Sequence, residues 1–412
     1  MARYGPVPDG RTDEYRDAIN YAFRLGEGPL GGEDDLEAHL YPELGERRAV
    51  GDDDSLHCVC RHYFFRTTLR GEWRDLAGLT VVASPPESRR KGHFSRLIEG
   101  SLREYRERGV TFSALWPFDY SLYRHYGWAV ANRYAWYACS PDDLAFADER
   151  EHRAGEFRRL SPDDWPALAS VNERHADRYG LSLSLERSET WWRERTFERH
   201  GEKRYAYGWE RDGEIRGYLV YSAEGGESDA RLTVHELPFV DHEALVNLLR
   251  FLFSHGSQVD SIRIRDRVDA PLLDVVPDPA AIECTVHPGP MLRLVDVEAA
   301  LEALATPGDG RQTNGRSTDA DGRLVLEVED RTASWNDGRF ALAVANGTAT
   351  CEPTDDSADA RLAVTALAQL CAGFRSAGDL VRADELTLET ETARGLLESW
   401  FPPTKPFLRE YF

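Results

Sequence analysis

The sequence of 412 residues is poor in lysine and has no long apolar run. Lysine occurs only at Lys91, Lys203 and Lys405, so arginine supplies nearly all of the positive charge. No stretch is long and apolar enough to cross a bilayer. The first residues, MARYGPVPDGRTDEYRD, also lack the apolar segment of a secretory signal. We therefore expect a cytoplasmic protein that has no membrane partner.

Cysteine is also scarce, and the six cysteines are scattered instead of being arranged as a disulfide scaffold. Cys58 and Cys60 stand two apart in HCVCRHYFF, a spacing that places both on one face of a strand. No second Cys or His pair stands at the spacing of a zinc site. We therefore expect this pair to pack in the core, and we expect no metal.

The chain has a formal net charge of -22 at pH 7, and its acidic residues are spread over the whole length. Diffuse acidity with little lysine resembles halophilic proteins, whose salty medium screens the self-repulsion. An acidic proteome encoded by a GC-rich genome is the alternative explanation. In either case nucleic acid is not an expected partner, because its phosphates would be repelled.

The length exceeds what one hydrophobic core usually supports, which predicts about two or three domains. Composition changes at a polar, turn-rich stretch near residue 150, and a third segment starts near GPMLRLVDVEAALEALA. The first segment alternates helix and strand patterns, and the second loosely repeats its order of elements. We expect an α/β chain with α+β character, divided into residues 1–149, 150–289 and 290–412.

A basic loop stands between a strand and a helix in VVASPPESRRKGHFSRLIEG. The helix carries an apolar stripe at Phe94, Leu97, Ile98, Leu102 and Tyr105. The unpaired N–H groups of a first helical turn and the helix dipole favour an anion, and Gly92 lets the backbone approach it closely. Neither the Walker A nor the Rossmann spacing is present, so we expect a phosphate site of another kind. The alternative is a basic cap on a solvated surface helix.

The loop and a later motif, LYRHYGW, together resemble the enhanced-intracellular-survival (Eis) family of GNAT N-acetyltransferases. That family shows a strand, a proline, R-R-x-G and a helix, followed by Tyr-x-x-aromatic-Gly-aromatic. The resemblance implies two fused GNAT-like domains, residues 1–149 and 150–289, and a sterol-carrier-like α+β domain, residues 290–412. The match to the first domain is specific, whereas the match to the other two is mainly architectural.

The resemblance also implies acetyl-CoA as the cofactor and assigns residues to it. Val82, Ala83 and Ser84 would end the strand that pairs with the pantetheine arm. The pyrophosphate loop would consist of Arg89, Arg90, Lys91, Gly92, His93, Phe94 and Ser95. Phe118 and Asp119 match positions that flank the cofactor beyond the next strand. The family usually has small residues there, so the bulky Phe118 is a departure.

Tyr123 occupies the first tyrosine of the second motif, which the resemblance assigns as the catalytic acid. A neutral phenol, with an ordinary pKa of about 10, can protonate a departing thiolate. The alternative is a tyrosine whose ring packs in the core and whose hydroxyl is paired. Tyr120, Tyr126 and Tyr134 lie nearby in the sequence, and only its place in the motif favours Tyr123.

The family uses its own C-terminal carboxylate as the base, which here is that of Phe412. A carboxylate with a pKa of about 3.5 is a weak base in water, although burial or a bridging water makes it more effective. Chain ends usually fray, but the tail PPTKPFLREYF is apolar enough to favour docking. The alternative bases are His125, Asp119 and Glu87.

The acceptors of the family imply transfer of acetyl to a primary amine of a polyamine, an aminoglycoside or a lysine-like group, and its assembly implies a hexamer. Phe23 and Trp73 are candidates for the acceptor pocket, although core packing is the expected role of each. The alternative function is a lipid-binding or small-ligand-binding protein with an inactive GNAT pair. We expect the third domain to deliver the C-terminus as a scaffold, and Trp400 fits an ordinary core as well as a lipid groove.

Overall fold

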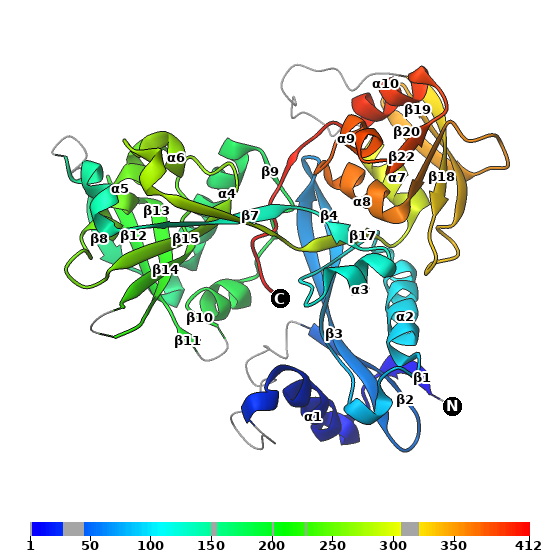
Figure 1. The fold of residues 1–412 in the computed structure, drawn as a ribbon, viewed down its shortest axis with the longest axis horizontal. Coiled ribbons are helices and arrows are strands. Elements are labelled where there is room, and N and C mark those ends of the chain that lie inside the picture. Colours follow the sequence, from blue (N-terminus) through cyan, green and yellow to red (C-terminus); the bar gives the residue numbers. More distant parts are fainter. Residues whose placement is uncertain (1, 28–44, 150–154, 200–201, 227–228, 306–320) are drawn as a thin grey trace. The chain divides into compact units, whose positions relative to one another are not determined.

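The computed structural model describes residues 2–27, 45–149, 155–199, 202–226, 229–305 and 321–412 (Figure 1). The chain forms two compact units, each described by itself below. The first unit comprises Met1–Asn132, Ser182–Glu186 and Pro290–Phe412. The second unit comprises Arg133–Leu181 and Arg187–Gly289.

The first unit is built on a seven-stranded sheet with the order β1-β2-β3-β4-β5-β17-β6. The strands are β1 (Arg3–Pro6), β2 (Gly45–Gly51), β3 (Leu56–Leu69), β4 (Glu72–Ala83), β5 (Phe112–Leu115), β17 (Met291–Leu294) and β6 (Ala129–Val130). Strands β4 and β5 run parallel, and the other neighbours run antiparallel. The helices are α1 (Thr12–Phe23), α2 (His93–Glu107) and α3 (Tyr120–His125).

Helix α2 lies beside this sheet (Figure 1) and begins directly after Gly92. Its predicted stripe is confirmed, because Leu97, Ile98, Leu102 and Tyr105 are all fully buried. Phe94 is partly buried and packs against the cluster that these four residues belong to. Burial of such a stripe, at roughly 25 cal/mol per Å² of apolar area, is the main force holding the helix on the sheet.

The second unit contains its own seven-stranded sheet, with the order β16-β7-β15-β14-β13-β12-β8. The strands are β16 (Glu283–Pro288), β7 (Arg133–Cys139), β15 (Ser261–Arg267), β14 (Arg231–Glu236), β13 (Glu214–Glu224), β12 (Tyr205–Arg211) and β8 (Glu156–Arg159). The helices are α4 (Trp165–Tyr179), α5 (His242–Phe253) and α6 (Leu272–Val275). Strands β14 and β15 run parallel, as β4 and β5 do in the first sheet. This shared pattern agrees with the expected duplication.

Two further strand pairs are short. They are β10 (Glu198–Arg199) with β11 (Glu202–Lys203), and β9 (Leu181–Ser182) with β23 (Lys405–Pro406).

Each sheet takes one strand from beyond its own stretch of sequence. Strand β7 follows the first sheet in the chain, yet it lies between β15 and β16 of the second sheet. Strand β17 follows the second sheet, yet it lies between β5 and β6 of the first. Sheet membership therefore changes at residue 133, where β7 begins.

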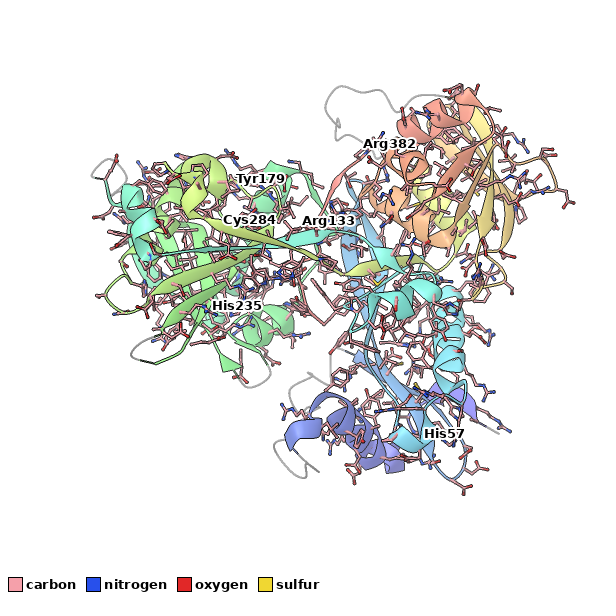
Figure 2. The ribbon with its side chains drawn as sticks, in the orientation of Figure 1. His57, Arg133, Tyr179, His235, Cys284 and Arg382 are labelled. Atoms are coloured by element: carbon pink, nitrogen blue, oxygen red, sulfur yellow. The ribbon has the colours of Figure 1, made fainter. Side chains whose placement is uncertain are left out.

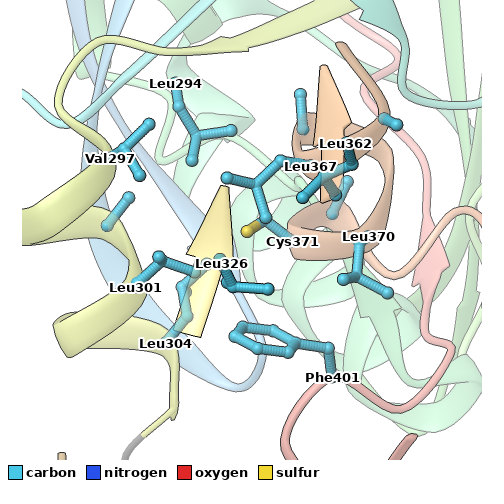
Figure 3. Close-up of a cluster of buried hydrophobic side chains, with 14 of the residues drawn as sticks. Leu294, Val297, Leu301, Leu304, Leu326, Leu362, Leu367, Leu370, Cys371 and Phe401 are labelled. Atoms are coloured by element: carbon cyan, nitrogen blue, oxygen red, sulfur yellow. The ribbon is translucent and has the colours of Figure 1, made fainter. Parts of the chain in front are cut away.

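The C-terminal part of the first unit forms a five-stranded sheet with the order β20-β19-β18-β21-β22. The strands are β20 (Thr348–Pro353), β19 (Gly338–Ala345), β18 (Gly322–Glu329), β21 (Ala360–Ala363) and β22 (Leu386–Leu388). The helices are α7 (Val297–Ala305), α8 (Val364–Ala372), α9 (Ala377–Arg382) and α10 (Glu391–Trp400). Figure 3 shows their shared core, which Leu294 of β17 joins, and Trp400 is buried in the same cluster as ordinary core.

Arg70 ties the β3–β4 hairpin to this C-terminal part. The hairpin turns at Arg70 and Gly71, both of which have a positive φ. The buried guanidinium of Arg70 donates to the carbonyls of Leu370 at 2.7 Å, Cys371 at 2.9 Å and Pro402 at 3.1 Å. The last carbonyls of a helix have no partner within the helix, so Arg70 satisfies the end of α8.

Two further expectations concern cysteine and the membrane. Cys58 and Cys60 are both fully buried, which confirms the expected core packing. Within the described ranges, the structure shows no helix with the length and apolar character needed to span a bilayer.

We predict that Arg70→Met destabilises the protein by roughly 3 kcal/mol or more, because three part-buried carbonyls lose a charged donor. The melting temperature, measured by calorimetry, should fall by several degrees. Arg382→Met is the matched control, since the Arg382 side chain is largely exposed on α9. Equal melting temperatures for the two variants would contradict this account of the docking.

Candidate functional site

Strands β4 and β5 separate after three residue pairs and leave a gap in the first sheet. Strand β4 pairs with β3 as far as Ala83, but it pairs with β5 only at Leu76, Ala77 and Gly78. Beyond Gly78, the described part of the chain shows no strand paired with β4 on its β5 side. The backbone groups of that edge are therefore available to another extended segment.

A β-bulge distorts β4 within this gap. The register shifts so that Val81 and Val82 together face Cys60. Val81 has φ of +45°, a conformation that costs a β-branched residue of order 1–3 kcal/mol. Bulges re-aim backbone and side-chain groups, and strained residues of this kind cluster at functional sites.

The basic loop follows β4 and ends at the first turn of α2. It contains a short 3-10 turn, Pro86–Ser88, and Arg90 with φ of +59°. No side chain caps the first turn of α2, which begins after Gly92, so its N–H groups remain open to an anion. Arg90 and Lys91 are exposed and form no ion pair within the described ranges. Arg89 donates to the carbonyl of Ser84 at 3.1 Å and so shapes the loop.

Two histidines pack against the start of α2. The ring of His57, which is labelled in Figure 2, stacks on the ring of His93 at 4.4 Å. His57 Nε2 lies 3.0 Å from the carboxylate of Asp52, and its Nδ1 lies 3.2 Å from Ser88 Oγ. Burial, assisted by nearby cations, lowers the pKa of His93 below its ordinary value. Near pH 7 the positive charge of the loop therefore comes from its arginines and lysine.

Tyr123 lies buried in α3 with only 4% of its surface exposed. Its ring contacts the rings of Phe94 at 6.0 Å, Phe118 at 5.7 Å and Trp128 at 6.2 Å between centroids. Its hydroxyl has no hydrogen-bond partner among the described residues, unlike the Tyr126 hydroxyl, which lies 2.7 Å from Ser95 Oγ. Burial raises the pKa of the Tyr123 phenol. The phenol is therefore neutral near pH 7 and lies in a largely apolar setting.

Phe118 and Asp119, at the start of α3, differ sharply in their surroundings. Phe118 is 69% exposed, the largest fraction of any described large apolar side chain. The carboxylate of Asp119 caps α3 by accepting from the backbone N–H groups of Ser121 at 2.8 Å and Leu122 at 3.1 Å. The hydrogen bond from the Ser121 hydroxyl, together with these amides, lowers the pKa of Asp119. A carboxylate so engaged is a poor base.

The C-terminal tail, whose end is marked in Figure 1, lies against the first sheet at the gap. Trp116 Nε1 donates to the carbonyl of Glu410 at 2.6 Å, and the Trp116 ring stacks on Tyr411 at 3.9 Å. Thr80 of β4 donates its hydroxyl to the backbone oxygen of Phe412 at 2.8 Å. A Cβ at Gly78 would lie 2.8 Å from the Phe412 ring, so the close approach requires glycine there.

Two aromatic residues do not pack as expected. Phe23 is 48% exposed and Trp73 is 41% exposed, so the expectation of core packing is wrong for both. Phe23 is the last residue of α1 and lies beyond the buried residues of that helix, the last of which is Asn20. Trp73 lies beside the hairpin turn, with the guanidinium of Arg66 5.6 Å from its ring centre.

The C-terminal part contains a polar pocket of about 760 Å³. Charged side chains dominate its lining, namely Arg124, Glu327, Glu329, Asp337, Arg339, Arg361, Asp384 and Glu385. Burying an apolar chain against so many charges would strip them of water without compensation. The pocket therefore does not suit a lipid.

Three site residues escaped the sequence analysis, namely Thr80, Trp116 and Asn132. Asn132 accepts from the N–H of Leu408 at 3.1 Å, and the other two hold Glu410 and Phe412. No local pattern marks them, because their partners are about 280 to 330 residues away in the chain.

Three family models match the chain. Two acetyltransferase (GNAT) domain models match residues 3–131 and 183–294, and a sterol carrier protein domain model matches residues 297–409. An uncharacterized N-acetyltransferase of Streptomyces griseus is 30% identical, with 92% of each chain covered. The N-acetyltransferase Eis of Mycobacterium tuberculosis is 27% identical, with 87% of this chain and 86% of the relative covered.

Solved structures show the same fold over the full length. A probable N-acyltransferase from Enterococcus faecalis V583 has a TM-score of 0.86 at 22% identity. Eis1 from Mycobacterium abscessus has a TM-score of 0.76 at 23% identity. Both alignments cover 100% of each chain.

We predict that Thr80→Val loosens the tail, because Phe412 loses a hydroxyl donor worth about 1 kcal/mol. Hydrogen exchange of the amides of residues 408–412 should quicken about fivefold. Thr80→Ser keeps the hydroxyl and should exchange at the wild-type rate. Unchanged exchange in Thr80→Val would mean that this hydrogen bond does not anchor the tail.

Proposed function

Since the chain belongs to the Eis type of the GNAT N-acetyltransferase family, we propose that it transfers acetyl from acetyl-CoA to a primary amine. The observation that carries this proposal is the gap beside β4. The basic loop leads from β4 to α2, the Tyr123 ring contacts Phe94 in the first turn of α2, and Thr80 of β4 binds Phe412. The acceptor would be a polyamine, an aminoglycoside or a lysine-like amine, and the chain charge of -22 favours such a cation.

Acetyl-CoA would supply the acetyl thioester, and the loop and strand edge would hold it. The open edge at Val82, Ala83 and Ser84 suits the amide groups of a pantetheine arm. The N–H groups of His93, Phe94 and Ser95, with Arg90 and Lys91, suit a pyrophosphate. Phe118 would lie beside the thioester end, where its exposed ring offers an apolar contact.

Tyr123 would donate its phenolic proton to the departing sulfur. As the amine nitrogen bonds to the carbonyl carbon, the carbon–sulfur bond breaks and the thiolate takes this proton. The raised pKa of Tyr123 keeps the phenol protonated until that moment. Its place in the motif favours it for this role, since the buried Tyr105 hydroxyl is also unpartnered among the described residues.

The carboxylate of Phe412 would accept the proton that the attacking amine loses. Thr80 holds the group at the gap, and the rings of Phe65, at 5.0 Å, and Tyr63, at 6.2 Å, surround the Phe412 ring. Partial burial makes a carboxylate a better base than it is in water. The rival bases are less suited, because Asp119 caps a helix and His125 and Glu87 are exposed.

The alternative of a lipid-binding protein with an inactive GNAT pair has less support, because the pocket in the C-terminal part is lined by charges. That part instead carries the tail to the first sheet, as a scaffold would. A hexameric assembly remains a proposal from the family resemblance, and a cytoplasmic location remains a proposal from the sequence. Calorimetry with acetyl-CoA and with a fatty acid separates the two functions, since the alternative requires affinity for the fatty acid alone.

We predict that Tyr123→Phe lowers kcat about a hundredfold or more, because the sulfur loses its proton donor. The Kd for acetyl-CoA, measured by calorimetry, should stay within about twofold of wild type. Tyr105→Phe is the matched control, since Tyr105 is another buried tyrosine of the same core. Burial raises the pKa of Tyr123, so in wild type kcat should not fall between roughly pH 7 and 10 through loss of this proton. A large loss of affinity in Tyr123→Phe would mean that the tyrosine is structural.

We predict that one glycine added after Phe412 lowers kcat at least about tenfold, because the carboxylate moves away from Thr80. Phe412→Leu is the control, because it keeps the carboxylate in place and changes only the ring. Steady-state kinetics at saturating acetyl-CoA provides the comparison. Wild-type turnover in the extended chain would exclude the terminal carboxylate and point to His125 or Asp119.

A further inference from the structure

A buried ion pair joins the first sheet to the C-terminal part of the same unit. Arg293 lies on β17, and Asp330 directly follows β18. Arg293 Nη2 lies 2.6 Å from Asp330 Oδ2, and the two side chains are 0% and 1% exposed. Charges buried so completely are tolerated only when hydrogen bonds satisfy them.

The carboxylate of Asp330 is held rigidly by its own loop. Its Oδ1 accepts from the backbone N–H groups of Thr332 at 3.0 Å and Ala333 at 3.1 Å. Its Oδ2 also accepts from the side-chain amide of Asn336 at 3.2 Å. Asp330 therefore gives Arg293 a fixed anchor.

The other end of the Arg293 guanidinium contacts the turn that follows α3. Its Nη1 donates to the carbonyl of Tyr126, and its Cζ lies 5.3 Å from the ring centre of Trp128. Gly127, with φ of +91°, passes so close that a Cβ there would lie 1.4 Å from Nη1. The glycine of the LYRHYGW motif is thus required by the position of Arg293.

The turn that follows α3 also holds Tyr123 in place. The carbonyl of Tyr123 accepts from the N–H groups of Tyr126 and Trp128, each at 3.1 Å. Helix α3 spans only Tyr120–His125, which is too short to be stable by itself. The direction of the phenol therefore depends on how the turn after α3 is held.

We propose that Arg293 and Asp330 are positioning residues for Tyr123 and couple the C-terminal part to the acid of the reaction. Asp330 orients Arg293, Arg293 fixes the Tyr126 carbonyl, and the turn aims the phenol. This inference rests on the proposed role of Tyr123 as the proton donor. It gives the C-terminal part a second task beside delivery of the terminal carboxylate.

The test compares Arg293→Met, Arg293→Lys and Asp330→Asn with the control Glu236→Gln. Glu236 pairs with Arg187 at 2.9 Å in the second unit, and those side chains are 12% and 1% exposed. All four variants should melt at a lower temperature than wild type. Only the first three should lose kcat, by about a hundredfold for Arg293→Met, because small misplacements of a reacting group are costly. Arg293→Lys should recover part of the loss, since it keeps one donor for Tyr126.

Three further readouts separate positioning from general damage. The Kd for acetyl-CoA should stay near the wild-type value, and the tail amides 408–412 should exchange at the wild-type rate. The alkaline limb of the pH profile of kcat should move to lower pH in Arg293→Met. The reason is that the loosened Tyr123 phenol becomes hydrated, so that its raised pKa falls. If Arg293→Met does not fold, Arg293→Lys and Asp330→Asn carry the same test.

Wild-type kcat in the folded Arg293 and Asp330 variants would overturn the inference. An equal loss of kcat in Glu236→Gln, or a loss of acetyl-CoA affinity that accounts for the effect, would also overturn it. Failure of the proposed function is distinguishable, because wild type would then show no acetyl transfer. Failure of the proposed role of Tyr123 would instead leave turnover unchanged in Tyr123→Phe, whatever the Arg293 variants do.

Discussion

The insertion of β17 into the first sheet is the constraint on which the site depends. Because this strand pairs with β5 and β6, the C-terminal part of the chain starts inside the sheet that carries the gap. The core of the C-terminal part includes Leu294 from β17 (Figure 3). Arg70 of the first sheet donates a hydrogen bond to a carbonyl at the end of α8. Shared strands and buried charges resist separation far better than surface contacts do. The tail therefore reaches Thr80 from a part of the chain that is itself packed against the first sheet.

The gap itself brings together groups that a regular sheet would keep apart. Strand β4 is strained at Val81, has no strand partner beyond Gly78 on its β5 side among the described residues, and leads into an uncapped helix start. In a chain of net charge -22, the exposed Arg90 and Lys91 provide a local positive potential at that helix. Thr80 holds Phe412 at the gap, and the neutral Tyr123 packs on Phe94 in the first turn of the helix that follows the gap. Such a combination suits a reaction that removes one proton and supplies another.

The local features of the site were predictable from the sequence because they depend on neighbouring residues. The strand, the basic turn and the stripe of α2 follow from residue periodicity, and the structure places them as expected. The exposed positions of Phe23 and Trp73 were not predictable. An apolar residue at a helix end or beside a hairpin turn has the same sequence pattern as an apolar residue of the core. The same holds for Asp119, whose role as the cap of α3 depends on a turn that periodicity does not reveal.

The sequence by itself determined the class of fold, the basic loop between a strand and a helix, and the position of the tyrosine motif. Tertiary structure alone decided that β7 and β17 enter sheets remote in sequence, and that Thr80, Trp116 and Asn132 receive the tail. It also decided why Gly127 is a glycine, since Arg293 approaches it from beyond the second unit in the chain. The physical reason is that helix and turn preferences act over a few residues. Strand pairing and buried ion pairs join residues whose separation in the sequence leaves no periodic trace.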